Sequence, residues 1–434
     1  MIDQTLVGFL MIGLMLALLF SGMAIAFALA VSGVVGLALV RPWPAVDFLL
    51  GTFPYSASAN LAYITLPLFL FMGYMAFAAG VADRAFDLAR AWLGAWPGGL
   101  AIASVFACAM FATVSGSSVA TAATVAQVAV PEMLRNGYSQ RLAAGCVAAA
   151  GTLGVLIPPS GILIVYSIVT EVPVTDLFTA AFVPGVVTAV AYATLITGWV
   201  RLTPELRSAT TLKPASWRTR FTTMLQSWEV LTLFLIVMGT IYLGIATATE
   251  AAAFGAAGAL LIALRRKSSK AAIVWRGLVD TGVATSSIFA LIIGAGLFGL
   301  ALATTQLPQQ LADWVGGLDL NRWQLLLALM IPYLVLGCFV DGISMMLLTL
   351  PIVFPIVMQA NIDPVLFGIL VTKTVEIGAI TPPVGLNCFV VKNTVPELKL
   401  GEVFRGTIPF IFVEIVLIAT IVAFPAIVTF PLGR

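Results

Sequence analysis

Two short polar clusters interrupt strongly apolar sequence, and their residues could bind a cation. The first cluster is Ser115–Ser118 (SGSS), and the second spans residues 340–344 (VDGIS). Hydroxyl and backbone carbonyl oxygens suit hard cations, here Na⁺, and the N-terminus of a helix attracts an anionic group. The two clusters are therefore candidate parts of an ion and solute site.

Two proline pairs interrupt other apolar segments. Pro158-Pro159 is followed by Ser160-Gly161, and Pro382-Pro383 is preceded by Thr381. A helix can break inside a bilayer only where the freed backbone groups line a cavity or lie within protein. Both breaks therefore add carbonyl and hydroxyl oxygens to the candidate site.

Asp341 is the one carboxylate within these clusters. A charge at the centre of a membrane helix costs about 2.5–3.5 kcal/mol, so a carboxylate there needs a partner. Coordination of a cation is one explanation, and an N-cap that accepts a backbone N–H is the other. Four interrupted segments in one chain favour a binding site over four separate caps.

Composition places the candidate site in a membrane. The 434 residues are 61% hydrophobic and 9% charged, with a mean hydropathy of +1.09, whereas soluble domains are about 25% charged. The apolar runs are continuous and do not alternate as in a β-barrel. We therefore expect an all-α polytopic membrane protein. A net charge of +2 without a basic patch gives no indication of a nucleic-acid partner.

The absence of histidine narrows the chemistry further. The chain has no His, and its four cysteines lie in apolar runs without metal-ligand spacing. A His-based proton relay and a Ser-His hydrolase are therefore excluded. The cysteines are better explained as small buried hydrophobes.

Helices of two kinds are predicted to position the clusters. The apolar arms around each cluster, within 98–134 and 323–360, are shorter than the roughly 20 residues of a span, which predicts re-entrant hairpins. The proline pairs divide 142–170 and 366–391 into half-helices. Unbroken spans are predicted at 6–20, 23–40, 61–79, 177–200, 230–246, 251–264, 282–303 and 408–428.

The remaining segments are predicted to lie at or outside the membrane surface. Amphipathic patterns at 81–92 and 271–280 predict interfacial helices. Residues 42–60 and 306–321 are predicted as loops, and 201–228 as the main cytoplasmic loop because it is rich in arginine.

The two interrupted regions are related by one offset of 224 residues. It superposes Pro131 on Pro355, Gly154 on Gly378, and Pro158-Pro159 on Pro382-Pro383. It also places Ser117 on Asp341. We interpret this as a duplicated unit of five spans and one hairpin. Chance spacing of prolines is the alternative.

Flanking charge predicts that the two copies are inverted. The first hairpin is flanked by Arg84, Arg90, Arg135 and Arg141, and the second by Asp313, Asp319, Asn321 and Asp363. By the positive-inside rule the first hairpin enters from the cytoplasm and the second from outside. Counting spans then places both termini in the periplasm. Inverted repeats with broken helices at the midplane are typical of secondary transporters.

Lys373 and Glu376 lie three residues apart in an apolar half-helix. Residues with this spacing can pair on one helix face. We expect a neutralised pair, and a direct contact from Lys373 to an anionic substrate is the alternative.

The ordered motifs resemble one family across nearly the whole chain. They are SGSSVATAATVAQVAVPEMLRNGY, GTLGVLIPPSGILIVY, FVPG at 182–185, ATATEAAAFGA, VDGISMMLLTLPIVFPI and FGILVTKTVEIGAITPPVGLNCFVV. The chain resembles the large membrane subunit of tripartite ATP-independent periplasmic (TRAP) transporters. The resemblance implies an elevator-type, Na⁺-coupled importer of an organic acid in the bacterial inner membrane. It also implies two partners: a separate four-helix membrane subunit and a soluble periplasmic substrate-binding protein.

The resemblance assigns roles to particular residues. It implies Na⁺ sites at the hairpin tips and helix breaks, namely Ser115, Gly116, Ser117, Ser118, Gly154, Pro158, Asp341, Gly342, Gly378, Thr381 and Pro383. It implies substrate contacts at Ser115, Ser117, Ser160 and Asp341. Lys373 and Gly161 depart from the residues expected at those positions, which puts substrate choice in question.

The same resemblance divides the chain into moving and fixed parts. Residues 98–176 and 304–400 would form the transport domain, and 1–97, 177–303 and 401–434 the scaffold. The closest alternative function is a stand-alone Na⁺/dicarboxylate symporter with the same architecture. A channel with re-entrant loops is an alternative of a different class, and an enzyme is not supported.

Overall fold

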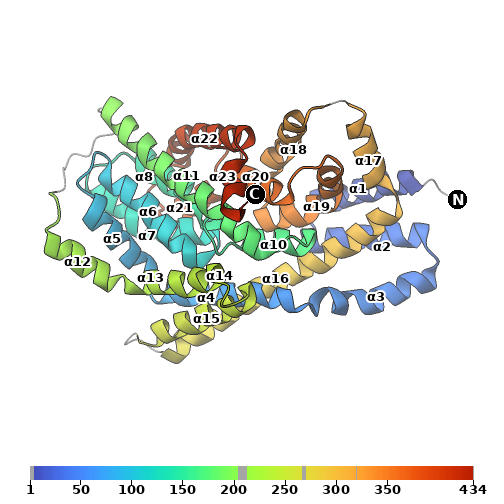
Figure 1. The fold of residues 1–434 in the computed structure, drawn as a ribbon, viewed down its shortest axis with the longest axis horizontal. Helices are drawn as coiled ribbons and strands as arrows, with labels where there is room; N and C mark the ends of the chain where they lie inside the picture. The colour runs from blue at the N-terminus through green and yellow to red at the C-terminus, as the bar shows by residue number, and fades with distance from the viewer. Residues whose placement is uncertain (1–3, 204–212, 266–269, 319, 434) are drawn as a thin grey trace.

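The computed structural model describes residues 4–203, 213–265, 270–318 and 320–433, and every regular element in these ranges is a helix (Figure 1). The all-α prediction is therefore confirmed. Long apolar sequence favours this outcome, because a helix satisfies its backbone hydrogen bonds internally.

One group of helices packs around the long helix α16. Helix α16 (Lys270–Thr304) lies against α2 and α4, and α15 packs along α4. The other members of this group are α1 (Gln4–Phe20), α2 (Ile25–Val40), α3 (Trp43–Ser58), η1 (Leu61–Ile64), α4 (Thr65–Ala78), α13 (Trp228–Phe234), the π-helical turn η3 (Leu235–Gly239), α14 (Thr240–Tyr242) and α15 (Ala248–Leu264).

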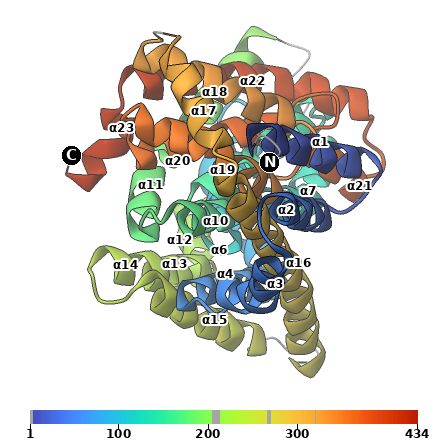
Figure 2. The same ribbon diagram turned by 90° about the vertical axis from the view of Figure 1, so that its right-hand side faces the viewer.

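A second group contains the hairpins and broken helices. From the first half it has α5 (Val81–Leu93), α6 (Gly99–Ser115), α7 (Ser118–Arg135), α8 (Gln140–Gly151), α9 (Leu153–Leu156), α10 (Gly161–Thr170) and α11 (Val174–Leu202). From the second half it has α17 (Leu307–Gly316), α18 (Arg322–Gly337), α19 (Gly342–Gln359), α20 (Pro364–Gly378), α21 (Leu386–Thr394), α22 (Leu400–Ala423), α23 (Ala426–Thr429) and η4 (Phe430–Leu432). In both views the second-half helices, orange to red, lie above α3, α4 and α15 (Figure 2).

Glycines set the close approach of the principal helix pairs. A methyl group on Gly33 of α2 would lie 2.7 Å from the Phe298 backbone of α16. A methyl group on Gly145 of α8 would overlap the Gly406 backbone of α22. Small residues permit such contacts between membrane helices, where packing rather than hydrophobic burial drives association. As a result, α22 is packed closely along α8.

Helix length and composition agree with a membrane protein. Four described helices are long and apolar enough to cross a bilayer, or up to seven if each bent pair counts as one span. One bent pair is α4 with α5, which meet at 66°, and another is Gln140–Leu156 with α10, at 40°. The structure has a helix, α5, over the segment predicted as interfacial at 81–92, and α6 and α7 are the two arms predicted for the first hairpin.

Three boundary predictions are wrong. Residues 42–60 and 306–321 are not loops, because they contain α3 and α17. Both helices carry proline in the first turn. The backbone N–H groups of a first turn have no partner within the helix, so a proline there does not break the helix. The segments 271–280 and 282–303 form one continuous helix, α16. Thr281 does not interrupt it, because its hydroxyl donates to the Gly277 carbonyl at 2.7 Å.

The predicted cytoplasmic loop 201–228 lies partly outside the described ranges, at residues 204–212. Its described part contains the helix α12 (Trp217–Gln226). The Arg84 guanidinium pairs with the Glu229 carboxylate, which joins α5 to α13.

Candidate transport site

The first hairpin turns at Ser115–Ser118, which we call tip 1. Gly116 adopts a left-handed conformation with φ of 62°, which residues with a side chain rarely adopt. Ser117 then caps α7, because its hydroxyl accepts from the Ala120 N–H at 3.3 Å. The SGSS order therefore ends one helix and begins the next within two residues.

Tip 1 packs directly on the first proline break, residues 157–160, which we call break 1. The Gly161 N–H donates to the Gly116 carbonyl at 3.1 Å. A methyl group on Gly154 would lie 2.5 Å from the Ser117 carbonyl oxygen, and one on Gly116 would lie 2.9 Å from the Pro159 carbonyl oxygen. Three backbone carbonyls thus converge on one tight joint.

Hydroxyl groups complete this joint. The Ser115 and Thr121 hydroxyl oxygens are 2.7 Å apart, and Ser115 also donates to the Ser117 carbonyl at 3.2 Å. Ser115, Ser118 and Thr121 are buried. Thr121 was not among the site residues predicted from the sequence. Its position three residues after Ser118, on the first turn of α7, was the signal that could have identified it.

Break 1 ends at Ser160, which is fully buried. The Pro158-Pro159 peptide bond is cis, as is that of Pro382-Pro383. The Ser160 hydroxyl accepts from the Leu163 N–H at 3.3 Å and so caps α10. Ser160 therefore lies at a helix N-terminus directly beside tip 1.

The second hairpin turns at residues 338–342, which we call tip 2. Asp341 caps α19, because its carboxylate accepts from the Ser344 N–H at 3.1 Å. The cap interpretation is therefore correct for the geometry of this residue. The side chain is nevertheless exposed, so the cap leaves it accessible to a ligand.

Tip 2 packs on the first half of the protein. A methyl group on Gly342 would overlap the end of the Ile162 side chain on α10 and would lie 3.0 Å from Val375 on α20. The Asn387 amide of α21 donates to the Ala148 carbonyl of α8 at 3.4 Å. The structure thus brings the two interrupted regions together, as the sequence analysis expected.

The second proline break spans residues 379–385, which we call break 2. A methyl group on Gly378 would overlap the Gly337 backbone, so α20 and α18 are in close contact just before the break. The Thr381 hydroxyl donates to the Ile377 carbonyl at 2.6 Å. Pro382 and Pro383 are exposed. Their surroundings differ from those of Pro158 and Pro159, which are buried.

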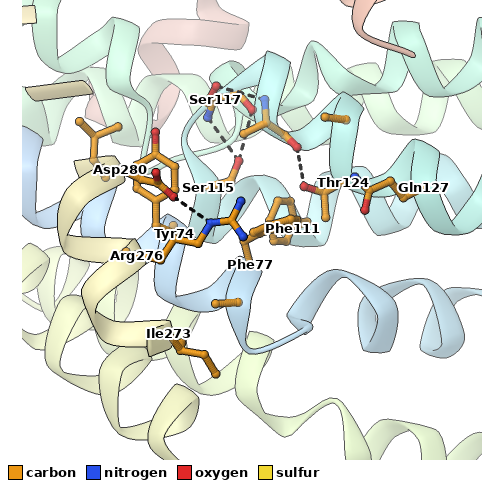
Figure 3. Close-up of a pocket in the computed structure, with 16 residues that line it drawn as sticks. Tyr74, Phe77, Phe111, Ser115, Ser117, Thr124, Gln127, Ile273, Arg276 and Asp280 are labelled. Carbon is orange, nitrogen blue, oxygen red and sulfur yellow. Dashed lines mark hydrogen bonds and ion pairs between the residues drawn. The ribbon is translucent and has the colours of Figure 1, made fainter. Parts of the chain in front are cut away.

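A cavity of about 470 Å³ lies between tip 1 and the α16 group. Ser115 and Ser117 line it on one side, and Tyr74, Arg276 and Asp280 on the other (Figure 3). Arg276 pairs loosely with Asp280 at 3.9 Å. Most of the other residues that line the cavity are apolar, so the Arg276–Asp280 pair and the tip 1 hydroxyls are among its few polar groups.

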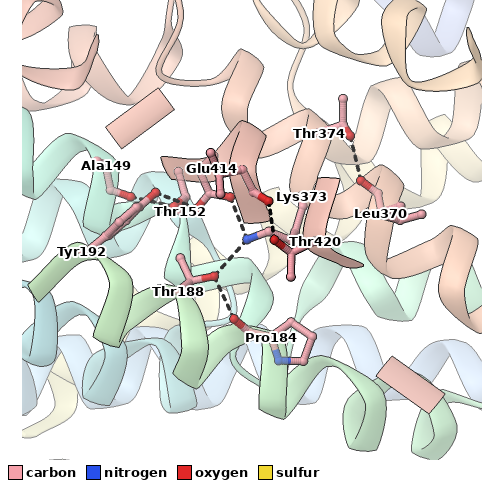
Figure 4. A network of polar contacts seen from close by, with 11 residues as sticks. Ala149, Thr152, Pro184, Thr188, Tyr192, Leu370, Lys373, Thr374, Glu414 and Thr420 are labelled. Atoms are coloured by element: carbon pink, nitrogen blue, oxygen red, sulfur yellow. Dashed lines mark hydrogen bonds and ion pairs between the residues drawn. The ribbon is translucent and has the colours of Figure 1, made fainter. Parts of the chain in front are cut away.

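Lys373 does not pair with Glu376, so that prediction is wrong. The Lys373 ammonium lies 2.7 Å from the Glu414 carboxylate of α22 and donates to the Thr188 hydroxyl of α11 at 2.9 Å (Figure 4). Packing between helices explains this pairing. Helix α20 packs against α11 and α22, and each of these helices supplies one partner of Lys373. Glu376 belongs to the same buried region but does not pair with Lys373.

These features agree with the comparison of the chain with known families. A sequence profile described as "Tripartite ATP-independent periplasmic transporter, DctM component" matches residues 12–427. The chain belongs to this family. It is thus a large permease subunit of a TRAP transporter, and its relatives are transporters rather than enzymes.

Three relatives show the range of the family. The chain is 37% identical to the C4-dicarboxylate large permease protein DctM of Pseudomonas aeruginosa, over 86% of both chains. It is 29% identical to the sialic acid large permease protein SiaM of Vibrio cholerae, over 94% of this chain and 95% of that one. It is 32% identical to the ectoine/5-hydroxyectoine large permease protein UehC of Ruegeria pomeroyi, over 85% of both.

A solved structure shares the fold. The YdaH transporter of Alcanivorax borkumensis superposes with a TM-score of 0.65 at 16% identity, over 92% of this chain and 96% of that one. At this identity the similarity supports the fold alone. The overall arrangement of helices is therefore that of a known transporter.

Proposed function

We propose that this TRAP permease subunit imports a small carboxylate compound in symport with Na⁺. The observation that carries the proposal is the joint between tip 1 and break 1. There, the Gly116, Ser117 and Pro159 carbonyls lie within one tight contact, beside the buried hydroxyls of Ser115 and Thr121. Oxygen atoms without nitrogen or sulfur ligands suit Na⁺ rather than a transition metal.

The chain offers the residues that such ions require. Ser115–Ser118, Gly154 and Pro158 would hold one Na⁺, and Asp341, Gly342, Gly378, Thr381 and Pro383 a second. Bound Na⁺ would supply positive charge next to the substrate carboxylate. Among the described residues there is no group of His, Cys, Asp and Glu that could hold a different metal.

The substrate would bind where helix N-termini face the two tips. Ser117 and Ser160 begin α7 and α10, and both hydroxyls lie at the N-terminal end of a helix. Such ends carry partial positive charge that favours a carboxylate. Ser115 and Asp341 would complete the contacts. The relatives named for C4-dicarboxylates and sialic acid support a carboxylate substrate.

Packing supports an elevator movement of one helix group against the other. We propose that the moving group includes both hairpins, both broken helices and also α11 and α22. The sequence analysis placed α11 and α22 in the scaffold, but α22 packs along α8, and α11 packs on α6, α20 and α22. The scaffold would then be centred on α16, and the cavity beside tip 1 would lie between the two groups.

Location and partners follow from the family. We propose an inner-membrane location with periplasmic termini and an inverted relation between the halves. A small membrane subunit would cover part of the exposed apolar surface on α1 and α3, where Phe20, Trp43 and Phe48 are exposed. A periplasmic binding protein would deliver the substrate. In one relative, the isethionate permease DctMQ of Oleidesulfovibrio alaskensis, the chain covers 61% of a longer protein.

Uptake into proteoliposomes tests the proposal. We expect radiolabelled dicarboxylate to accumulate only with an inward Na⁺ gradient, the small subunit and the binding protein. Uptake without the binding protein would instead support the stand-alone symporter. Single-channel currents would support a channel and contradict the proposal.

A further inference from the structure

Three charged side chains lie buried together where the two halves meet. Lys373 and Glu376 of α20 and Glu414 of α22 are each 5% exposed or less. The group therefore contains two carboxyl groups and one ammonium, so one acidic side chain lies without a basic partner. Buried ionisable residues in membrane segments are rare and usually functional, so the unmatched acid needs an explanation.

Lys373 and Glu414 neutralise each other. The Lys373 ammonium contacts the Glu414 carboxylate at 2.7 Å and donates to the Thr188 hydroxyl at 2.9 Å. The other Glu414 oxygen accepts from the Tyr192 hydroxyl at 2.7 Å. These contacts satisfy the ammonium from two neighbouring helices, as Figure 4 shows. Glu376 is therefore the acidic side chain without a basic partner.

Glu376 is only partly satisfied. It interacts with the Ser118 hydroxyl of tip 1, but its Oε2 atom is buried and has no hydrogen-bond partner among the described residues. The Thr372 hydroxyl, one helical turn earlier on the same face of α20, is also buried and unpartnered. Buried oxygens normally have a partner in the protein or in ordered water, so two unpartnered oxygens on one face are free to bind a ligand.

The face of α20 that carries Glu376 lies where the two halves of the chain meet. Glu376 lies two residues before Gly378, where α20 ends at break 2, and Ser118 belongs to tip 1. A cation held there would contact both interrupted regions at once. Carboxylate and hydroxyl oxygens are the ligands that hard cations prefer.

From these contacts we propose a Na⁺ site in which Glu376 is the anionic ligand and the Ser118 and Thr372 hydroxyls are neutral ligands. The inference rests on the proposed Na⁺-coupled function and extends it. This site adds a carboxylate to the set implied by the family resemblance, which did not include Glu376 or Thr372. It also gives the Lys373–Glu414 pair a role: pairing with Glu414 keeps Lys373, the one buried cation among the described residues, from competing for Glu376.

Na⁺ titrations of the full purified chain test the site. In the wild type we expect Na⁺, but not K⁺, to raise the melting temperature. Even outer-shell substitutions weaken metal sites by about 10–100-fold, so Glu376→Gln should raise the half-saturating Na⁺ concentration at least about tenfold. It should also remove one Na⁺ per substrate from the flux ratio in proteoliposomes. Thr372→Val should have a smaller effect in the same direction.

A double variant is the matched control. Lys373→Met with Glu414→Leu removes two neighbouring buried charges and leaves Glu376 in place, so its Na⁺ titration should resemble that of the wild type. Where Glu376→Gln does not fold, Glu376→Asp keeps the charge on a shorter side chain and should weaken Na⁺ binding.

Three results would contradict either the proposed Glu376 site or the proposed Na⁺-coupled function. Unchanged Na⁺ titration and flux ratio in Glu376→Gln would refute this site while leaving the proposed function standing. Equal loss in the double variant would show that any buried charge in this region has the same effect, which also refutes the site. A wild type that does not respond to Na⁺ would reject the proposed function itself.

Discussion

Tip 1 and tip 2 occupy corresponding positions in the two halves but differ in packing. Tip 1 is closed on break 1 through the hydrogen bond from the Gly161 N–H to the Gly116 carbonyl. Tip 2 carries the exposed Asp341 and contacts the end of the Ile162 side chain on α10. The tip 1 joint is backbone against backbone. Gly342 of tip 2 meets side chains only, and backbone contact near tip 2 lies before the turn, between Gly337 and Gly378. We infer from this difference in packing that tip 1 is a fixed joint and tip 2 an adjustable cover.

The corresponding residues Ser117 and Asp341 show the same contrast. Each begins the second arm of its hairpin and accepts from a backbone N–H three residues later, at 3.3 Å and 3.1 Å. The capping role is therefore common to both. The charge and the exposure belong to Asp341 alone, so only Asp341 can change its partners without disturbing the joint.

The largest expected effect comes from forcing the first joint apart. Gly154→Ala places a methyl group 2.5 Å from the Ser117 carbonyl, against backbone that cannot rotate away. Overpacking of this kind costs about 1–3 kcal/mol, and we expect Na⁺-stimulated uptake to be lost. Gly198→Ala on α11 is the control, because nothing lies within 4 Å of its added methyl. Wild-type uptake by Gly154→Ala would disprove the closed joint.

The second-largest effect is expected from removing the charge at tip 2. Asp341→Asn keeps an N-cap, since Asn and Asp cap about equally well, but deletes the anion. We expect it to lose Na⁺-stimulated uptake while still inserting in the membrane. Asp363→Asn is the matched control. Asp363 also caps a helix, because its carboxylate accepts from the Val365 and Leu366 N–H groups of α20. If Asp341→Asn transports normally, Asp341 is a cap and nothing more.

Removing single hydroxyls from tip 1 should have an intermediate effect. Ser115→Ala and Thr121→Val each delete one oxygen of the 2.7 Å hydroxyl pair. A lost hydrogen bond of this kind is worth about 1 kcal/mol, so we expect the Na⁺ concentration for half-maximal uptake to rise several-fold. Thr124→Val is the comparison, since that hydroxyl donates to the Ala120 carbonyl within its own helix. Equal shifts in all three would show that tip 1 has no special role.

The smallest effect is expected at the contact between Gly342 of tip 2 and the Ile162 side chain. Gly342→Ala meets only the end of the Ile162 side chain and, at 3.0 Å, a methyl group of Val375. These side chains can adjust, so uptake should fall only slightly and should recover with Ile162→Val. A loss as large as that of Gly154→Ala would mean that the two tips are packed equally rigidly.

Local sequence predicted the interrupted helices well and the tertiary partners poorly. Gly116 and the proline pairs determine where helices end through their own backbone preferences, so both hairpin turns and both breaks could be located. Lys373 could not be assigned to Glu414, because the two lie in different helices. Thr121 was overlooked for the same reason: its partner, Ser115, is on the opposite arm. The helices α3 and α17 were mistaken for loops because the first segment is mixed in composition and the second is polar, which are properties of a surface helix as well as of a loop.

The central claim is that Na⁺ bridges tip 1 and break 1. Amide hydrogen exchange of the purified chain in NaCl and in KCl measures this directly. We expect Na⁺ to slow exchange in the segments 115–121 and 154–161, which contain the converging carbonyls and the Gly161 N–H. Equal exchange in NaCl and KCl across both segments would contradict the claim.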